Sequence, residues 1–195
     1  MFILYALVLA LVVGLATGGR PMALANLQFR WAPLIVVGFL SQVVLFSDAV
    51  AERVGDAGPP LYVASTLLVG VAVVRNLQLP GLPLVALGAA CNMAAILANG
   101  GFMPATTEAL ASLGKTAPTI YSNSAVVATP LLAPLIDRFA LPRWLPFANV
   151  FSVGDVLLAI GVFVLIVAVM RQRSSEPAGS PGRPTAAPAE SAQEA

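Results

Sequence analysis

Long apolar runs are the sequence feature that most constrains the fold of this chain. A helix of about 20 residues crosses the roughly 30 Å hydrocarbon layer of a bilayer. Five runs approach that length, and they cover residues 2–17, 31–46, 61–74, 82–98 and 151–170. We therefore predict an all-α fold, a polytopic membrane helix bundle of about five transmembrane helices.

The composition supports this reading and excludes several chemistries. Of the 195 residues 58% are hydrophobic and 10% are charged, whereas soluble domains carry about 25% charged residues. The chain has no histidine and one cysteine, Cys91, so the usual general base, the commonest zinc ligand and an internal disulfide are excluded. A net charge of +1 without a basic stripe argues against nucleic acid as a partner. We predict no cofactor, no metal site and no catalytic residue.

The arginines indicate an orientation in the membrane. With five crossings, Arg20, Arg30, Arg75 and Arg171 fall on one side, and such residues stay on the cytoplasmic side. We therefore predict a multi-pass protein of the bacterial inner membrane, with its N-terminus outside and its C-terminus in the cytoplasm. Its partners are membrane lipids, and a second copy of the chain or another membrane protein is an alternative. Arg20 and Arg30 are expected to contact lipid headgroups, each worth about 1 kcal/mol near an anionic surface.

Two parts of the chain fall outside the five runs. Residues 119–136 are moderately apolar but interrupted by Pro130 and Pro134, and we expect an interfacial or re-entrant helical segment, because irregular backbone at membrane depth must be buried in protein. Whether this segment spans, re-enters or lies on the membrane stays open. Residues 174–195 lack large apolar side chains, which predicts a disordered cytoplasmic tail. The domains are thus a transmembrane helical domain, 1–173, and the tail, 174–195.

Small residues recur at every fourth position in two of the runs, where they allow close helix contact. These are Ala6, Ala10, Gly14 and Gly18 in the first, and Ala86, Ala90, Ala94 and Ala98 in the fourth. We expect these two helices in the bundle interior, with a homodimer contact as the alternative.

Asp155 is the one ionisable side chain inside a predicted span. A charge at the bilayer centre costs about 2.5–3.5 kcal/mol on insertion scales. Ser152 and Asp155 have the spacing of a capping box, in which each side chain bonds the other's backbone amide. The pattern therefore predicts a helix cap, and the alternative is a role in binding a ligand or a proton.

A second polar group follows the fourth run. Asn99, Gly100 and Gly101 are typical of a helix stop, and two glycines also permit a concavity of amides that binds anions. Asn92 lies seven residues earlier on nearly the same helix face, and an amide in lipid needs a partner. We therefore expect a ligand-binding polar pocket at the outer face, made of Asn92, Asn99, Gly100, Gly101, Ser152 and Asp155.

Three motifs carry a resemblance to a known family. They are residues 18–20 (Gly-Gly-Arg), 99–104 (Asn-Gly-Gly-Phe-Met-Pro) and 151–155 (Phe-Ser-Val-Gly-Asp). Over roughly residues 1–173 the chain resembles a family of uncharacterised bacterial membrane proteins, domain-of-unknown-function family 5317. The resemblance implies a small multi-span membrane protein and no particular reaction.

Three functions are consistent with these features. The first is a non-enzymatic membrane module that binds a small ligand or lipid at the outer face, or serves in a membrane complex. The second is a small transporter or proton-coupled carrier that uses Asp155. The third is an enzyme on lipid-linked substrates, which ranks last because such enzymes need several acids, bases or a metal site.

Overall fold

The computed structural model describes residues 2–114 and 124–172, and this part of the chain is mostly helical. The α-helices are α1 (Phe2–Ala16), α2 (Ala32–Leu45), α3 (Asp48–Ala51), α4 (Gly58–Arg75), α5 (Leu82–Ala98), α6 (Thr107–Ser112) and α7 (Val153–Met170). Short 3-10 helices are η1 (Pro21–Asn26), η2 (Gly55–Ala57) and η3 (Ala133–Leu135). Each of the five predicted apolar runs is thus a helix, and α3 and α6 lie in the connections.

Two helical stretches are long and apolar enough to cross a membrane, judged by length and composition within the described residues. They are Gly55–Arg75, which joins η2 to α4, and Val153–Met170. The helices α1, α2 and α5 are apolar but shorter, at 15, 14 and 17 residues.

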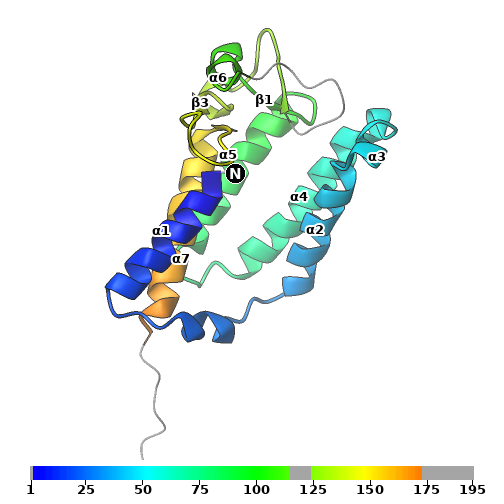
Figure 1. Ribbon diagram of the computed structural model, residues 1–195. Coiled ribbons are helices and arrows are strands. Elements are labelled where there is room, and N and C mark those ends of the chain that lie inside the picture. Colours follow the sequence, from blue (N-terminus) through cyan, green and yellow to red (C-terminus); the bar gives the residue numbers. More distant parts are fainter. Residues whose placement is uncertain (1, 115–123, 173–195) are drawn as a thin grey trace, which may run out of the picture.

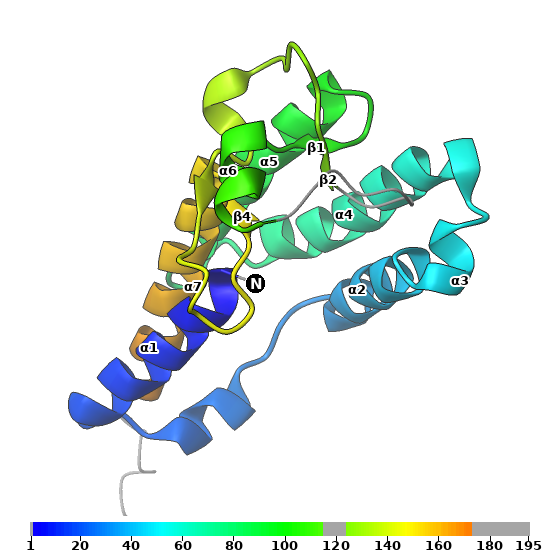
Figure 2. The same ribbon diagram turned by 45° about the horizontal axis from the view of Figure 1, so that its top comes forward.

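The five long helices form a row in which neighbours are α1, α7, α5, α4 and α2. Helices α1, α7 and α5 lie close together, whereas the α2–α4 pair leans away from them (Figures 1 and 2). The expectation that the fourth apolar run lies inside the bundle agrees with the place of α5. The same expectation for the first apolar run is wrong, because α1 lies at the end of the row and α7 takes the inner place.

Glycines set the distance between α5 and α7. A Cβ added to Gly88 would lie 2.5 Å from the carbonyl oxygen of Gly154, and one added to Gly161 would lie 2.6 Å from that of Gly81. The two backbones therefore touch directly. On the other side of α7, the small residues Ala10 and Gly14 of α1 are buried, as that helix's spacing predicted.

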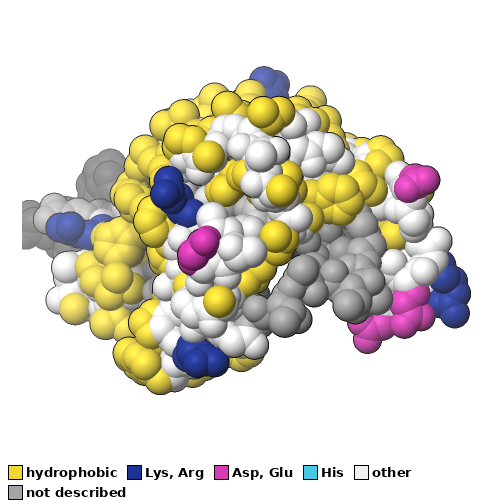
Figure 3. Space-filling view, turned by 90° about the horizontal axis from the view of Figure 1, so that it is seen from above, with side chains coloured by type: hydrophobic (Ala, Val, Ile, Leu, Met, Phe, Trp, Pro, Cys, Tyr) yellow, Lys and Arg dark blue, Asp and Glu magenta, His cyan; other side chains and the backbone are white. Residues whose placement is uncertain are grey.

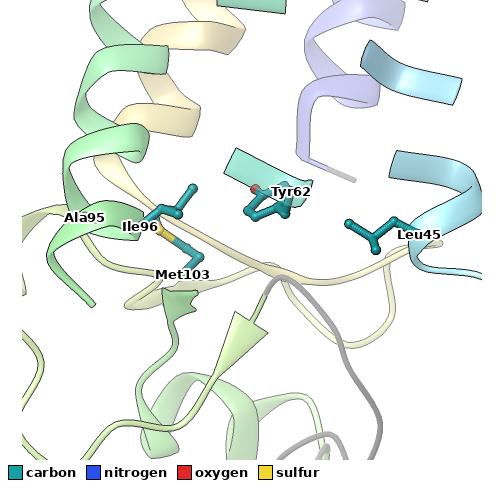
Figure 4. Packing of buried hydrophobic residues seen from close by; sticks show 5 residues of the cluster. All are labelled: Leu45, Tyr62, Ala95, Ile96 and Met103. Atoms are coloured by element: carbon teal, nitrogen blue, oxygen red, sulfur yellow. The ribbon is translucent and has the colours of Figure 1, made fainter. Parts of the chain in front are cut away.

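The two ends of the row differ in character. We call the end that carries residues 46–58, 99–114 and 124–152 the loop end, and the opposite end, with Arg20, Arg30, Arg75 and Arg171, the arginine end. At the loop end Leu45, Tyr62, Ala95, Ile96 and Met103 form a buried cluster that ties α2, α4 and α5 to the following loop (Figure 4).

The loop end contains short strands as well as the short helices α3, α6, η2 and η3. The strands β1 (Met103–Pro104) and β2 (Ser124–Ala125) pair in parallel, and β3 (Phe139–Ala140) and β4 (Val150–Phe151) pair antiparallel. The expected helical segment over 119–136 is wrong for its described part, which consists of β2, bends and turns and is helical only at η3. Pro130 and Pro134 explain this, because proline removes an amide donor and disfavours helix in the preceding residue. Residues 119–123 and the predicted tail, 174–195, lie outside the described residues.

Candidate functional site

The candidate site lies where α5 reaches the loop end and meets the first turn of α7. Ser152 is the N-cap of α7 and is fully buried. Its Oγ accepts a hydrogen bond from the Asp155 amide at 3.1 Å, and its own amide donates to Asp155 Oδ2 at 3.0 Å. The capping box that the sequence predicted is therefore present.

Asn92 joins this cap to the neighbouring helix. Its Nδ2 donates to Asp155 Oδ1 at 2.8 Å, and its Oδ1 accepts from Ser152 Oγ at 2.9 Å. The space for this amide exists because Gly154 has no side chain: an added Cβ there would collide with Asn92 Oδ1. Asn92, Ser152 and Asp155 thus form a closed ring of hydrogen bonds in which both Asp155 oxygens have a donor.

Asn99 does not join this ring. Its Oδ1 accepts from the Leu131 amide at 2.9 Å, and its Nδ2 donates to the Leu131 carbonyl at 3.0 Å and to the Ala95 carbonyl at 2.7 Å. Asn99 therefore fastens the returning loop to the end of α5. The Leu131 backbone takes up hydrogen bonds of the Asn99 side chain, and the spacing of residues along α5 did not predict this partner.

Gly100 and Gly101 reverse the chain after α5. Their φ angles are 74° and 91°, in the left-handed region that glycine adopts without a steric penalty. The Gly101 amide also donates to the Ile96 carbonyl at 2.9 Å, and a Cβ on Gly101 would lie 2.5 Å from the Cβ of Pro59. These contacts match the helix stop that the sequence predicted and bring the loop against the start of α4.

Asp137 is the functional candidate that the sequence reasoning did not select. Its backbone is fixed beside β1, since its amide donates to the Pro104 carbonyl and its carbonyl accepts from the Thr106 amide, both at 2.9 Å. Its Oδ1 is buried and has no hydrogen-bond partner among residues 2–114 and 124–172. Burial, with a smaller contribution from the nearby Asp155 carboxylate, raises the pKa of this carboxyl from 3.8 to about 7. No motif or periodicity linked Asp137 to Asp155, because the link depends on how the loop folds back.

The site offers carboxyl and amide groups but few of them. Within residues 2–114 and 124–172 no three His, Cys, Asp or Glu side chains gather in a way that could hold a metal ion. The groups available to a ligand are therefore Asp137 and the unused hydrogen-bonding capacity of Asn92.

The two arginines expected at lipid headgroups lie at the arginine end, far along the helices from this site. The Arg20 amide donates to the Met170 carbonyl at 2.7 Å. The Arg30 backbone is clamped by Asn76, whose Oδ1 accepts from the Arg30 amide and whose Nδ2 donates to the Arg30 carbonyl, both at 2.8 Å. Asn76 is fully buried, so this clamp fixes the chain that enters α2.

Residues 26–167 match the model of a family of unknown function, DUF5317, which is more than half of the chain. The chain belongs to this family. The matched range contains the motifs at 99–104 and 151–155, whereas Gly18-Gly19-Arg20 lies outside it. No curated protein and no solved structure matches the chain.

Proposed function

We propose that this chain is an integral membrane protein with five spanning helices, α1, α2, α4, α5 and α7. The outward faces of these helices support the proposal, because they expose many aliphatic side chains, and soluble monomers rarely expose large continuous apolar patches to water. Val8, Val43 and Val74 are 61%, 67% and 60% exposed. Lipid removes this surface from water, at about 25 cal/mol per Å². Trp31, at the start of α2, and Trp144, in the loop before α7, fit the membrane interface, a position that tryptophan favours.

We further propose that the arginine end faces the cytoplasm of a bacterial cell and the loop end faces outward. Cysteine labelling tests this topology in a Cys91→Ser background. An impermeant thiol reagent added to intact cells should label Ser112→Cys, because Ser112 is an exposed loop-end residue, and should leave Ser175→Cys unlabelled until the cells are opened. Labelling of Ser175→Cys from outside would contradict this topology.

The function we propose is non-enzymatic binding of a small ligand at the loop end, through Asp137. The observation that carries this proposal is the buried Asp137 Oδ1 without a donor. A buried acceptor left unpaired costs about 1–3 kcal/mol, and a ligand with an ammonium or other hydrogen-bond donor recovers this energy. In this proposal the ring of Asn92, Ser152 and Asp155 forms the rigid wall beside the ligand, and Asp155 adds negative charge.

Ligand binding is tested by thermal unfolding of the detergent-solubilised protein at pH 8, where Asp137 is ionised. The probes are methylammonium, ethanolamine and agmatine at millimolar concentration. We expect at least one to raise the melting temperature, because a ligand at 100 times its Kd stabilises the folded state by about 2.7 kcal/mol. Asp137→Asn should abolish the rise. The matched control Glu108→Gln, an exposed loop-end acid, should keep it.

Two results would contradict this assignment. One is the absence of any rise with all three probes, and the other is a rise of equal size in Asp137→Asn.

A second function, proton-coupled transport, is favoured by one observation. A carboxyl with a pKa of about 7 gains and loses its proton near neutral pH, as a proton carrier requires. Asp137 suits this role better than Asp155, whose two oxygens are engaged in the helix cap. Proteoliposomes that contain a pH-sensitive dye distinguish the two functions, since only a carrier acidifies the lumen when an outside acid step is applied.

A further inference from the structure

An apolar groove that could hold a ligand runs between α4 and α5. Its volume is about 350 Å³, within the range of roughly 300–1,000 Å³ that is usual for small-molecule sites. Its walls are almost entirely apolar. They include Leu67, Gly70, Val71 and Val74 of α4, and Ala86 and Ala90 of α5.

Small residues on both helices leave room for the groove. A Cβ added to Gly70 would meet no atom within 4 Å, and three of the four lining residues of α5 are alanines. Leu67, Val71 and Val74 on its rim are 51%, 47% and 60% exposed, so the groove opens on the outer surface of the helix row. In the proposed membrane placement, this opening faces the hydrocarbon layer. A lipid site in the groove therefore rests on that proposed placement.

Positive charge gathers where the groove reaches the arginine end. Val74 lines the groove, and Arg75 follows it at the end of α4. The Arg75 guanidinium lies over the Trp31 ring at 5.6 Å from its centroid. Asn76, the next residue, holds the Arg30 backbone. Arg75 and Arg30 are therefore brought to the same end of the groove by fixed contacts.

Negative charge in the described part of the chain lies at the other end. Asp48, Glu52 and Asp56 occupy the connection between α2 and α4 at the loop end, where acidic side chains gather over α3 in the space-filling view (Figure 3). Glu108, Asp137 and Asp155 lie at the loop end too. The arginine end of the groove thus carries cations that no described acid neutralises.

We infer that this groove binds one acyl chain of an anionic phospholipid, with the lipid phosphate held by Arg75 and Arg30. The apolar walls match a hydrocarbon chain, and the arginines match a phosphate, which guanidinium recognises with paired hydrogen bonds. A zwitterionic lipid fits the walls equally well but is attracted less to the arginine end. The site therefore selects its lipid by headgroup charge.

Native mass spectrometry of the full-length protein in detergent tests this inference. Phosphatidylglycerol and phosphatidylcholine with identical acyl chains are titrated in parallel. We expect one phosphatidylglycerol to be retained in preference to phosphatidylcholine, and inorganic phosphate at millimolar concentration not to displace it. Arg75→Gln should weaken retention about fivefold, which corresponds to the contribution of one basic residue at an anionic surface. Arg138→Gln, at the exposed loop end, is the matched control and should change nothing.

A second variant blocks the groove itself. Gly70→Leu places a side chain in the open space and should abolish retention of the lipid chain, while the melting temperature shows that the protein is still folded. If Gly70→Leu does not fold, the headgroup comparison and Arg75→Gln decide on their own.

Three outcomes would overturn the inference. They are equal binding of the two lipids, undiminished binding in folded Gly70→Leu, and a dimer of the chain that Gly70→Leu dissociates, since a second copy would then be the occupant. Resistance of the protein to alkaline extraction from membranes is measured separately. A protein that resists extraction but shows no lipid preference would refute the lipid site and leave the membrane placement intact.

Discussion

Replacement of Gly88 by alanine is a sharp test of how α5 and α7 are held together. The added Cβ would lie 2.5 Å from the Gly154 carbonyl oxygen and 2.8 Å from the Leu158 amide nitrogen. Both atoms belong to the backbone, so no side-chain rotation relieves the clash and the helices must separate. Overpacking of this kind costs about 1–3 kcal/mol.

The chain supplies a matched control in Gly70, which also lies within a long helix. Both substitutions gain helix propensity, at most about 1 kcal/mol, but a Cβ on Gly70 meets nothing within 4 Å. The difference between the two variants therefore isolates the overpacking cost. We expect Gly88→Ala to be less stable than Gly70→Ala by about 1–3 kcal/mol.

The assay is reversible unfolding in mixed micelles by titration with sodium dodecyl sulfate, followed by circular dichroism of the helices. Separation of α5 from α7 should also lengthen the 2.8 Å bond between Asn92 and Asp155. Equal unfolding free energies for Gly88→Ala and Gly70→Ala would refute direct backbone contact between these helices.

Three further predictions concern buried polar groups. The pKa of folded Asp137 is raised from 3.8 to about 7, so its contribution to stability is fully present below pH 4 and is lost as the pH rises to about 7. Asp137→Asn should therefore flatten the plot of melting temperature against pH between these two values. An unchanged plot would count against the buried carboxyl. Asn76→Ala should lower the unfolding free energy by about 1–3 kcal/mol, since the amide and carbonyl of Arg30 lose their partner, whereas the exposed Gln78→Ala should change it by less than about 0.5 kcal/mol. Asn92→Leu should cost about 1–3 kcal/mol because it leaves two polar groups of the α7 cap unpaired, and a neutral result would show that the hydrogen-bond ring does not couple α5 to α7.

The long helices and the cap of α7 were predictable because their signals are local. Each apolar run forms a helix, and Ser152 and Asp155 need only a spacing of three residues to form a capping box. Asn92 was also placed correctly beside them, since an amide on an apolar helix requires a polar neighbour.

The remaining features depend on contacts between distant segments. Like Asn92, Asn99 is an amide side chain next to apolar residues, and the sequence predicted a side-chain partner for both. Asn99 instead bonds the backbone of Leu131, and no side-chain pattern identifies a backbone partner. The burial of the Asp137 carboxyl depends on how the loop folds back. On α5, residues Gly88 and Asn92 face α7, while the regularly spaced Ala86 and Ala90 face α4. The series of alanines at every fourth position therefore did not mark the closest helix contact, which is that between α5 and α7.

The pairing of α1 with α7 has a consequence for how the chain is assembled. These are the first and last of the long helices in the described residues, and α1 has no other long helix as a neighbour in the row. During synthesis, α1 therefore lacks its packing partner until residues 153–170 have been made. Helix α7 lies between α1 and α5 in the row and follows the other four long helices in the sequence. A chain that stops before α7 therefore lacks the contacts that join α1 to the rest of the row.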